Sequence, residues 1–199
     1  MSYRNTAVKT DTELKQWWCQ HGEQLEHEFI QIMTGVFRNF KIEINPKKFT
    51  DPTAPDLKMK AKNGISLGDL KSQRTPFFSA GKYGLDPQFT FTFNVKDYHR
   101  YIELYDDLNL LIWVKWEQTE MTLGSQEIKL YPMNSIYHIT LKQLVAFIEE
   151  NNSPIHHYKR RPVDTKSSHP LSGMVDSKGN ATSSYLIDLR RIGPLVTFH

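Results

Sequence analysis

Two aspartates and a lysine stand close together on a stretch that reads as a β-hairpin. The stretch from Pro55 to Gln73 is PDLKMKAKNGISLGDLKSQ, and it carries Asp56, Asp69 and Lys71. Aspartate is a poor strand former, so its presence on both arms needs a reason. Carboxylates on one face of paired strands offer the hard oxygen ligands that Mg²⁺ prefers, and a nearby ammonium can contact a metal-bound water or a phosphate oxygen. These residue types predict a divalent-cation site.

The dipeptide Asn63-Gly64 predicts how the two arms pair. It is a strong signal for a two-residue type I′ turn, because both central positions of that turn need a positive φ. With this turn, Asp56 lies opposite Lys71 and Lys58 lies opposite Asp69, so all four side chains share a face and the two aspartates are diagonal neighbours. The opposite face then holds the residues expected in the core, which are Leu57, Met59 and Leu70. The alternative interpretation is a pair of exposed cross-strand ion pairs, which are common and contribute little.

A third carboxylate belongs to the first expected helix. Residues 11–40 show apolar residues at helical spacing, with Asp11 or Thr12 as the cap. On a helical wheel Glu26 falls within the apolar sector, between Met33 and Leu25. A carboxylate there is costly unless it is paired or metal-bound, so Glu26 is expected to point toward the sheet. The alternative is a side chain at the helix boundary that reaches water.

The remaining elements are expected to complete a mixed α/β domain. Clean alternation predicts a half-buried strand over residues 88–95, and Leu110 to Trp116 (LLIWVKW) reads as a buried strand. Further strands are expected over residues 41–44 and 131–138, a short turn or helix over 97–107, an amphipathic helix over 140–150 opened by Thr140, a long polar loop over 151–183, and a strand or helical turn over 185–192. This order favours one domain, residues 1–199, with a mixed sheet.

The charge is unevenly distributed along the chain. The net charge is only +3, yet residues 41–82 hold nine Lys and Arg against four Asp and Glu, and residues 83–150 hold five against ten. A basic zone around acidic site residues suggests a polyanionic substrate, although a solvated lysine-rich face is the competing interpretation. A single cysteine and the absence of a long apolar run predict a cytoplasmic protein without a membrane span.

Taken together, these motifs resemble the PD-(D/E)xK nuclease superfamily. Pro55-Asp56 corresponds to the PD half and Asp69-Leu70-Lys71 to the (D/E)xK half, with Asp in place of the commoner Glu. Gln73 fits the polar position often found after the lysine. The run from Gly22 to Glu26 is similar to the family's G-x-x-x-E helix. The resemblance covers roughly residues 12–75 and implies a restriction-endonuclease-like fold, in which helices flank a central mixed β-sheet.

The resemblance also implies a reaction, metal-dependent hydrolysis of DNA phosphodiester bonds by an endonuclease of restriction, homing or structure-specific type. Asp56, Asp69, the carbonyl of Leu70 and Glu26 would hold Mg²⁺, with Mn²⁺ as a substitute. Lys71 would orient or help deprotonate the attacking water, and Gln73 would complete the site. The basic residues near the cleft would contact phosphates; these are Lys58, Lys60, Arg74, Lys82, Lys159, Arg160 and Arg161. Because one site cuts one strand, a homodimer is expected.

Two other functions stay open at this point. One is a catalytically silent DNA-binding protein or subunit on the same fold, and the other is an unrelated α/β protein whose ion pairs mimic the motif. The segment HHYKRRP is read either as a clamp on the duplex or as a solvated loop. His156 and His157 would suggest zinc, but adjacent histidines without further ligands at the right spacing are a weak signal.

Overall fold

The main sheet has six strands and carries the predicted hairpin. The computed structural model describes residues 15–36, 41–51, 53–62, 64–158 and 182–198, with side chains from residue 22 onward. The strand order is β1-β2-β3-β5-β8-β11. Their bounds are β1 Lys41–Ile44, β2 Leu57–Ala61, β3 Gly64–Gln73, β5 Asn109–Lys115, β8 Asn134–Thr140 and β11 Pro194–Thr197. Strands β3 and β5 run parallel and the other neighbours run antiparallel, so the sheet is mixed as expected.

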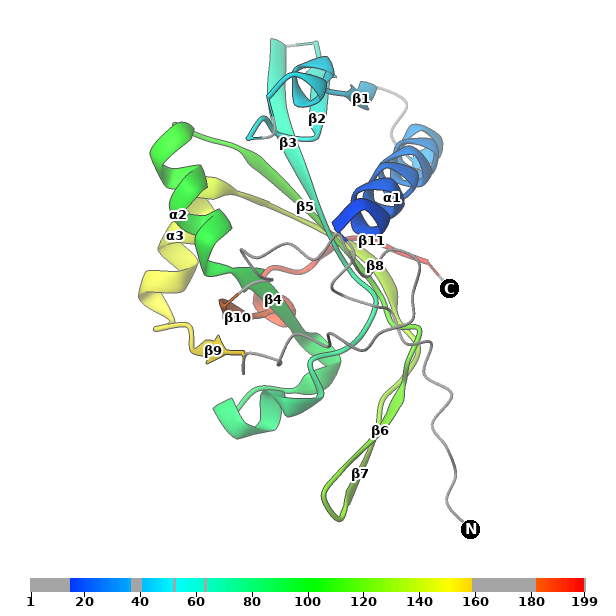
Figure 1. Ribbon diagram of the computed structural model, residues 1–199, viewed down its shortest axis with the longest axis vertical. Coiled ribbons are helices and arrows are strands. Elements are labelled where there is room, and N and C mark those ends of the chain that lie inside the picture. The colour runs from blue at the N-terminus through cyan, green and yellow to red at the C-terminus, as the bar shows by residue number, and fades with distance from the viewer. Residues whose placement is uncertain (1–14, 37–40, 52, 63, 159–181, 199) are drawn as a thin grey trace.

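Helices cover both faces of this sheet, as Figure 1 shows. The long helix α1 (Lys15–Val36) lies on one face, while α2 (Val95–Leu104) and α3 (Leu141–Glu150) lie on the other. Strand β5 explains the two layers, because its successive side chains alternate between them. Leu111 and Trp113 pack with Phe29 of α1, whereas Leu110 belongs to the core cluster on the side of α2 and α3. The expected buried strand is therefore confirmed, with a core on each side of it.

A second sheet of three strands joins the layer that holds α2 and α3. Its order is β4-β10-β9, with bounds Thr90–Asn94, Ser183–Asp188 and Ile155–His157. The predicted alternation is confirmed in β4, where Phe91 and Phe93 are buried in the core. Short 3-10 helices lie at Pro46–Phe49 (η1), Phe78–Tyr83 (η2), Pro87–Phe89 (η3) and Leu189–Arg191 (η5).

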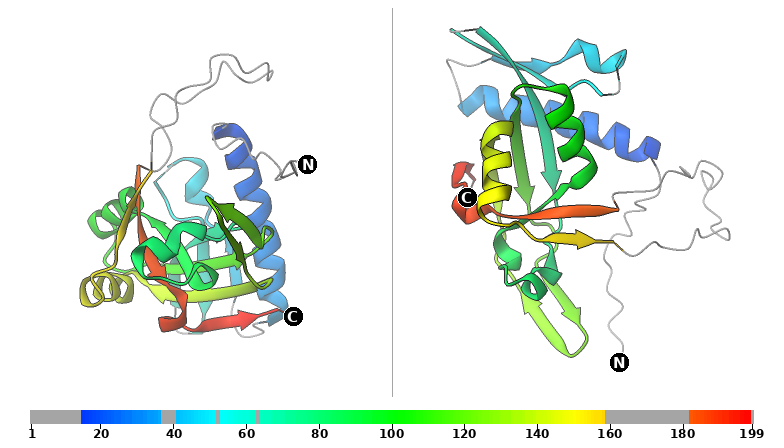
Figure 2. Two further views of the ribbon diagram at one scale, coloured as in Figure 1. Left: turned by 90° about the horizontal axis from the view of Figure 1, so that it is seen from below. Right: turned by 90° about the vertical axis from the view of Figure 1, so that its left-hand side faces the viewer.

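The hairpin β6–β7 extends away from the rest of the molecule (Figures 1 and 2). Strands β6 (Glu120–Leu123) and β7 (Gln126–Lys129) form a two-stranded sheet of their own. Gly124, at φ 63°, begins the two-residue connection between them. These two strands were not expected from the sequence, although a Gly-Ser dipeptide between alternating residues is a hairpin signal.

Several expected elements are confirmed with shifted ends. The described part of the first helix is α1 (Lys15–Val36), and its expected cap at Asp11 or Thr12 lies outside the described residues. The strand expected at residues 131–138 begins three residues later, at Asn134, and the turn or helix at 97–107 is the helix α2. Thr140 caps α3 as predicted, through a reciprocal capping box with Gln143. The expected loop at 151–183 contains β9, and its residues 159–181 lie outside the described part of the chain. Within the described residues, no helix has both the length and the apolar character needed to cross a membrane.

Candidate functional site

The start of β2 brings Asp56 next to β3. Leu57 pairs with Gly68, so the next step outward sets Asp56 opposite Asp69. The predicted register, with Asp56 opposite Lys71, is wrong by two residues, because Ala61 pairs with Gly64 and the connection lies one residue earlier than expected. The carboxylate of Asp56 also accepts a hydrogen bond from the backbone N–H of Leu70 at 3.3 Å. The side chain of Asp56 thus contacts β3 from a position just before β2 begins.

Asp69 is a buried carboxylate with two direct partners. Only 4% of the residue is exposed. The hydroxyl of Tyr101 in α2 donates to its Oδ2 at 2.7 Å, and the Nζ of Lys71 lies 2.8 Å from the same oxygen. The alternative of an exposed Lys58–Asp69 ion pair is therefore wrong, since Lys58 lies opposite Leu67. Asp69 points to the side of the sheet covered by α2.

Residues of helix α2 also hold the side chain of Lys71, which belongs to β3. Asp97, in the first turn of α2, contacts the Nζ of Lys71 at 3.1 Å, and Arg100 contacts the other oxygen of Asp97 at 3.0 Å. The amine of Lys71 also lies 5.2 Å from the ring centre of Tyr101. Lys71 is thus fixed between two carboxylates and an aromatic ring.

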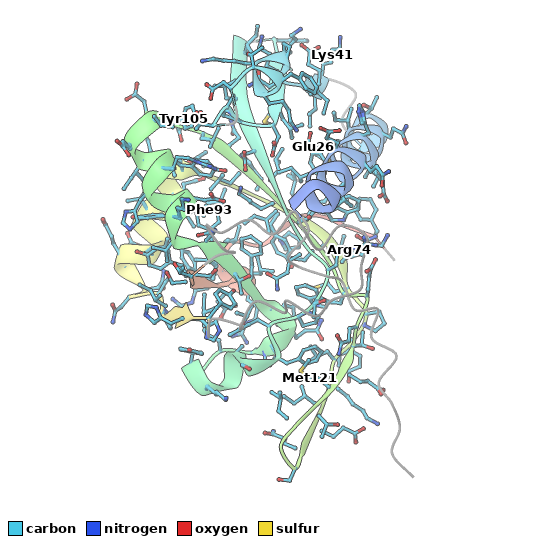
Figure 3. All side chains as sticks on the ribbon, viewed as in Figure 1. Glu26, Lys41, Arg74, Phe93, Tyr105 and Met121 are labelled. Atoms are coloured by element: carbon cyan, nitrogen blue, oxygen red, sulfur yellow. The ribbon has the colours of Figure 1, made fainter. Side chains whose placement is uncertain are left out.

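Glu26 approaches the same place from the opposite face of the sheet. It is 7% exposed and extends from α1 toward β2 and β3, where Figure 3 labels it. Its two carboxylate oxygens accept hydrogen bonds from the Nζ of Lys48 at 2.6 and 2.5 Å. That same Nζ lies 3.3 Å from Asp56. The prediction that Glu26 is buried and faces the sheet is confirmed, and Lys48 connects it to Asp56.

A buried asparagine fixes the segment that carries Lys48. The side-chain amide of Asn45 donates to the carbonyl of Pro55 at 2.8 Å, and its backbone N–H donates to the carbonyl of Asp56 at 2.8 Å. Its side-chain oxygen caps η1 by accepting from the N–H of Lys47. The end of β1, the helix η1 and the start of β2 are thereby held as one unit.

The electrostatics of the cluster reflect crowded carboxylates. Burial, followed by the charges of Asp69 and Glu26, raises the pKa of Asp56 to about 7. Burial also raises the pKa of Glu26, although Lys48 opposes this. Burial would lower the pKa of Lys71, but the negative charge of Asp69 and Asp97 more than offsets it and the pKa lies above its ordinary value. Protonating or binding a cation at Asp56 relieves this repulsion.

The chemistry of these oxygen atoms suits a hard divalent cation. Asp56, just before β2, contacts the backbone N–H of Leu70, the residue after Asp69 in β3, and Glu26 adds a third carboxylate through Lys48. Among the described residues, no three His, Cys, Asp or Glu side chains are already grouped to hold a metal ion. The amines of Lys48 and Lys71 instead neutralise the acids. The ligand types fit Mg²⁺ or Mn²⁺, and a cation at this place would compete with Lys48 for Glu26 and Asp56.

Gln73, the remaining predicted catalytic residue, makes no hydrogen bond to the acids within the described part of the chain. Gln73 joins the two sheets, because its side-chain oxygen accepts from the N–H of Thr92 at 2.9 Å and its amide donates to the carbonyl of Thr75 at 2.9 Å. In this conformation its amide is committed to positioning β4.

The predicted phosphate-binding residues do not form one group with the acids. Lys60 is paired with Glu43 at 2.6 Å, and Arg74 is paired with Glu117. Lys82 is exposed on η2 and Lys58 is partly exposed on β2. Lys159, Arg160 and Arg161 lie outside the described residues.

Four members of the cluster were missed by sequence reasoning. Lys48 reaches the acids through tertiary packing of η1, for which the sequence carries no local signal. Asp97, Arg100 and Tyr101 had one, since their spacing of three and four residues places them on one side of a helix. The segment was expected to be a turn or helix, but its polar face was not interpreted.

Searches against protein-family models, curated proteins and solved structures found no match to this chain. Its function is therefore argued from the cluster itself.

Proposed function

We propose that this chain is a metal-dependent DNA endonuclease with a restriction-endonuclease-like fold. The observation that carries this proposal is the convergence of Asp56, Asp69 and Glu26 from the segment before β2, from β3 and from α1, with Lys71 held beside them. Buried carboxylates that repel one another reduce the stability of a fold, and such arrangements concentrate at functional sites. The mixed sheet flanked by helices and the order of the PD and DxK motifs agree with this class.

In this proposal each residue of the site has a role that follows from its chemistry. Asp56, Asp69, the carbonyl of Leu70 and Glu26 would hold Mg²⁺ or Mn²⁺. When bound, such a cation lowers the pKa of a water ligand and neutralises charge on the phosphate. Lys71 keeps its proton at neutral pH because its pKa is raised. It therefore acts by orienting the attacking water and stabilising negative charge, rather than as a general base.

Positioning is the role of the residues from α2. Tyr101 fixes one oxygen of Asp69 with its hydroxyl, and Asp97 fixes the amine of Lys71. Neither requires contact with substrate. Both hold Asp69 and Lys71 in position, which matters because small displacements at a catalytic centre reduce the rate by large factors.

The substrate in this proposal is DNA, bound through its phosphates. The excess of basic residues over 41–82 supports it, and among the described members of the predicted set Lys58 and Lys82 form no ion pair. Binding would weaken as salt rises. A homodimer, which would cut both strands, and a cytoplasmic location are further parts of the proposal.

A plasmid-nicking assay tests this function. The full chain is incubated with supercoiled DNA in the presence of Mg²⁺, Mn²⁺ or EDTA. We expect nicking with either metal, none in EDTA, and loss of activity in Asp69→Ala and Lys71→Ala. Lys62→Ala, an exposed lysine at the far end of the same hairpin, is the matched control and should remain active. Activity in EDTA, or full activity of Asp69→Ala, would refute the proposal.

One observation favours a silent DNA-binding protein as the second candidate. Lys48 already neutralises Glu26 and contacts Asp56, so an ammonium group satisfies acids that a catalytic cation would need. This candidate predicts DNA binding that does not respond to Mg²⁺ and no nicking under any condition.

A further inference from the structure

Four rings gather where η2 packs against β9. They belong to Phe77, Tyr83, His156 and Tyr158. The ring of His156 lies 4.8 Å from that of Phe77, 5.8 Å from that of Tyr83 and 4.6 Å from that of Tyr158, between centroids. The hydroxyl of Tyr83 is hydrogen-bonded to Nδ1 of His156 at 2.8 Å. The imidazole is thus the centre of the group, and we call these four residues the ring cluster.

The ring cluster does not belong to the hydrophobic core. None of its four members is among the described residues of the two core clusters. Phe77, Tyr83 and His156 are half-buried, and Tyr158 is 39% exposed. The Tyr158 hydroxyl donates to Oγ of Ser184 at 3.3 Å, which fixes the ring while it remains accessible. Partly exposed aromatic faces held in place are suited to stacking on a flat ligand.

A lysine and a second histidine border the ring cluster. Lys82 and His157 are exposed beside it. Burial lowers the pKa of His156, and its neighbours His157 and Lys82 lower it further. A neutral imidazole beside a lysine favours an aromatic ligand that carries negative charge, and it disfavours the quaternary ammonium ligands that bind other aromatic cages.

The small sheet connects the ring cluster to the acids. His156 pairs with Ser184 of β10, and Ser184 pairs with Asn94 of β4. Two strand spacings separate His156 from Asn94, or roughly 10 Å. Asn94 is the N-cap of α2, whose first turn holds Asp97 against Lys71. A nucleic-acid strand passing Lys71 would need only a few nucleotides to reach the rings.

We propose that the ring cluster is a stacking site for an unpaired nucleobase, so that the preferred substrate contains a single-stranded or unpaired segment beside the cleaved bond. This inference rests on the proposed function, because the nuclease site supplies the reason for DNA to pass here. The chemistry recognised is a flat heteroaromatic ring attached to a phosphate. A base within a strand and a free nucleotide both offer it.

The test follows the fluorescence of 2-aminopurine, which falls when the base stacks. A single-stranded 12-nucleotide DNA with one 2-aminopurine is titrated with the full chain in EDTA, so that no cleavage occurs. We expect quenching by the wild type. Tyr158→Ala should weaken binding about tenfold, within the range measured when stacking aromatics are removed. Tyr158→Phe keeps the ring and should retain the quenching.

Further arms of the experiment separate the alternatives. Tyr131→Ala removes an aromatic side chain that is 81% exposed on the connection after β7, and it should bind like the wild type. Phe77→Leu serves as a second variant if Tyr158→Ala fails to fold. Displacement of the strand by equimolar deoxyadenosine monophosphate would assign the base site to free nucleotides. Equal affinity of the wild type for the single strand and for a duplex, or unchanged quenching in Tyr158→Ala, would overturn the inference.

The outcome is independent of the plasmid assay. If the plasmid is nicked and Tyr158→Ala still quenches fully, the stacking site is wrong and the nuclease stands. If quenching depends on Tyr158 and no metal supports nicking, the stacking site stands and the nuclease proposal fails.

Discussion

Replacing Asp56 with asparagine is expected to stabilise the fold at neutral and alkaline pH. Burial and the charges of Asp69 and Glu26 raise the pKa of the Asp56 carboxyl from its ordinary value of 3.8 to about 7. The shift is about three units, and each unit corresponds to ~1.36 kcal/mol. Keeping Asp56 ionised in the folded protein therefore costs about 4 kcal/mol at most. Asparagine has nearly the same shape and its side-chain oxygen can still accept the N–H of Leu70.

The sign of the pH dependence follows from proton binding. Between pH 3.8 and about 7 the folded protein keeps a proton on Asp56 that the unfolded chain has released. The free energy of unfolding of the wild type therefore falls as the pH rises through this window and is unaffected by this group above it. The advantage of Asp56→Asn should be about 1.5 kcal/mol at pH 5 and about 2–4 kcal/mol at pH 8, the lower figure allowing for the lost contact with Lys48.

Urea denaturation at pH 5 and pH 8 in EDTA measures this difference. For a chain of this size the gain at pH 8 corresponds to a Tm increase of roughly 5–15 °C. The control is Asp51→Asn. The pKa of that surface carboxyl is lowered by hydrogen bonds from Thr53, so its replacement should give no gain at pH 8. An Asp56→Asn protein that is no more stable than the wild type at pH 8, or that gains equally at both pH values, would show that these carboxylates do not repel one another.

Three further predictions concern neighbouring side chains. Lys48→Met should bind Mn²⁺ about tenfold more tightly in titration calorimetry, because the competing ammonium is gone. Lys47→Met, at an exposed neighbouring position, should bind Mn²⁺ like the wild type. Weaker binding by Lys48→Met would contradict competition between Lys48 and the cation. Tyr101→Phe should lower the free energy of unfolding by about 1–3 kcal/mol in urea, because Asp69 is left short of a donor. Tyr105→Phe, which loses an exposed hydrogen bond to the carbonyl of Thr53, should cost less than half as much. Thr140→Ala should cost about 1 kcal/mol through loss of the α3 cap while nicking persists; a smaller change would mean that the capping box contributes little.

The sequence predicted which faces the hairpin residues occupy, although it misplaced the register. Leu57, Met59 and Leu70 are buried as expected. A shift of two residues moves every pair along the strand but keeps each side chain on its face. The Asn63-Gly64 signal placed the turn one residue late. Gly64 instead begins β3 at φ 138°, a conformation that favours glycine.

The partners of the predicted residues were harder to foresee. Glu26 stood out because its position on the helical wheel conflicts with its charge. Lys48 did not, because a lysine in a Pro-containing turn is ordinary and only the packing of η1 brings it to Glu26. Gln73 was assigned by position in a motif, and its hydrogen bonds to β4 depend on the second sheet, which the sequence did not reveal. Local patterns define faces and elements, while contacts between distant segments need the topology.

The parallel pairing of β3 with β5 affects when the cluster can assemble during folding. The hairpin of β2 and β3 forms from neighbouring residues, but β5 begins 36 positions after β3 ends, counted from Gln73 to Asn109. The connecting segment, which includes α2, must cross from one end of the sheet to the other before β5 can pair in parallel with β3. Such long-range closure is slow compared with hairpin formation. A nascent or partly unfolded chain would therefore carry the PD and DxK residues without Tyr101 and Asp97, which hold Asp69 and Lys71 in place. The cluster would reach its complete geometry only late in folding, when β5 pairs with β3.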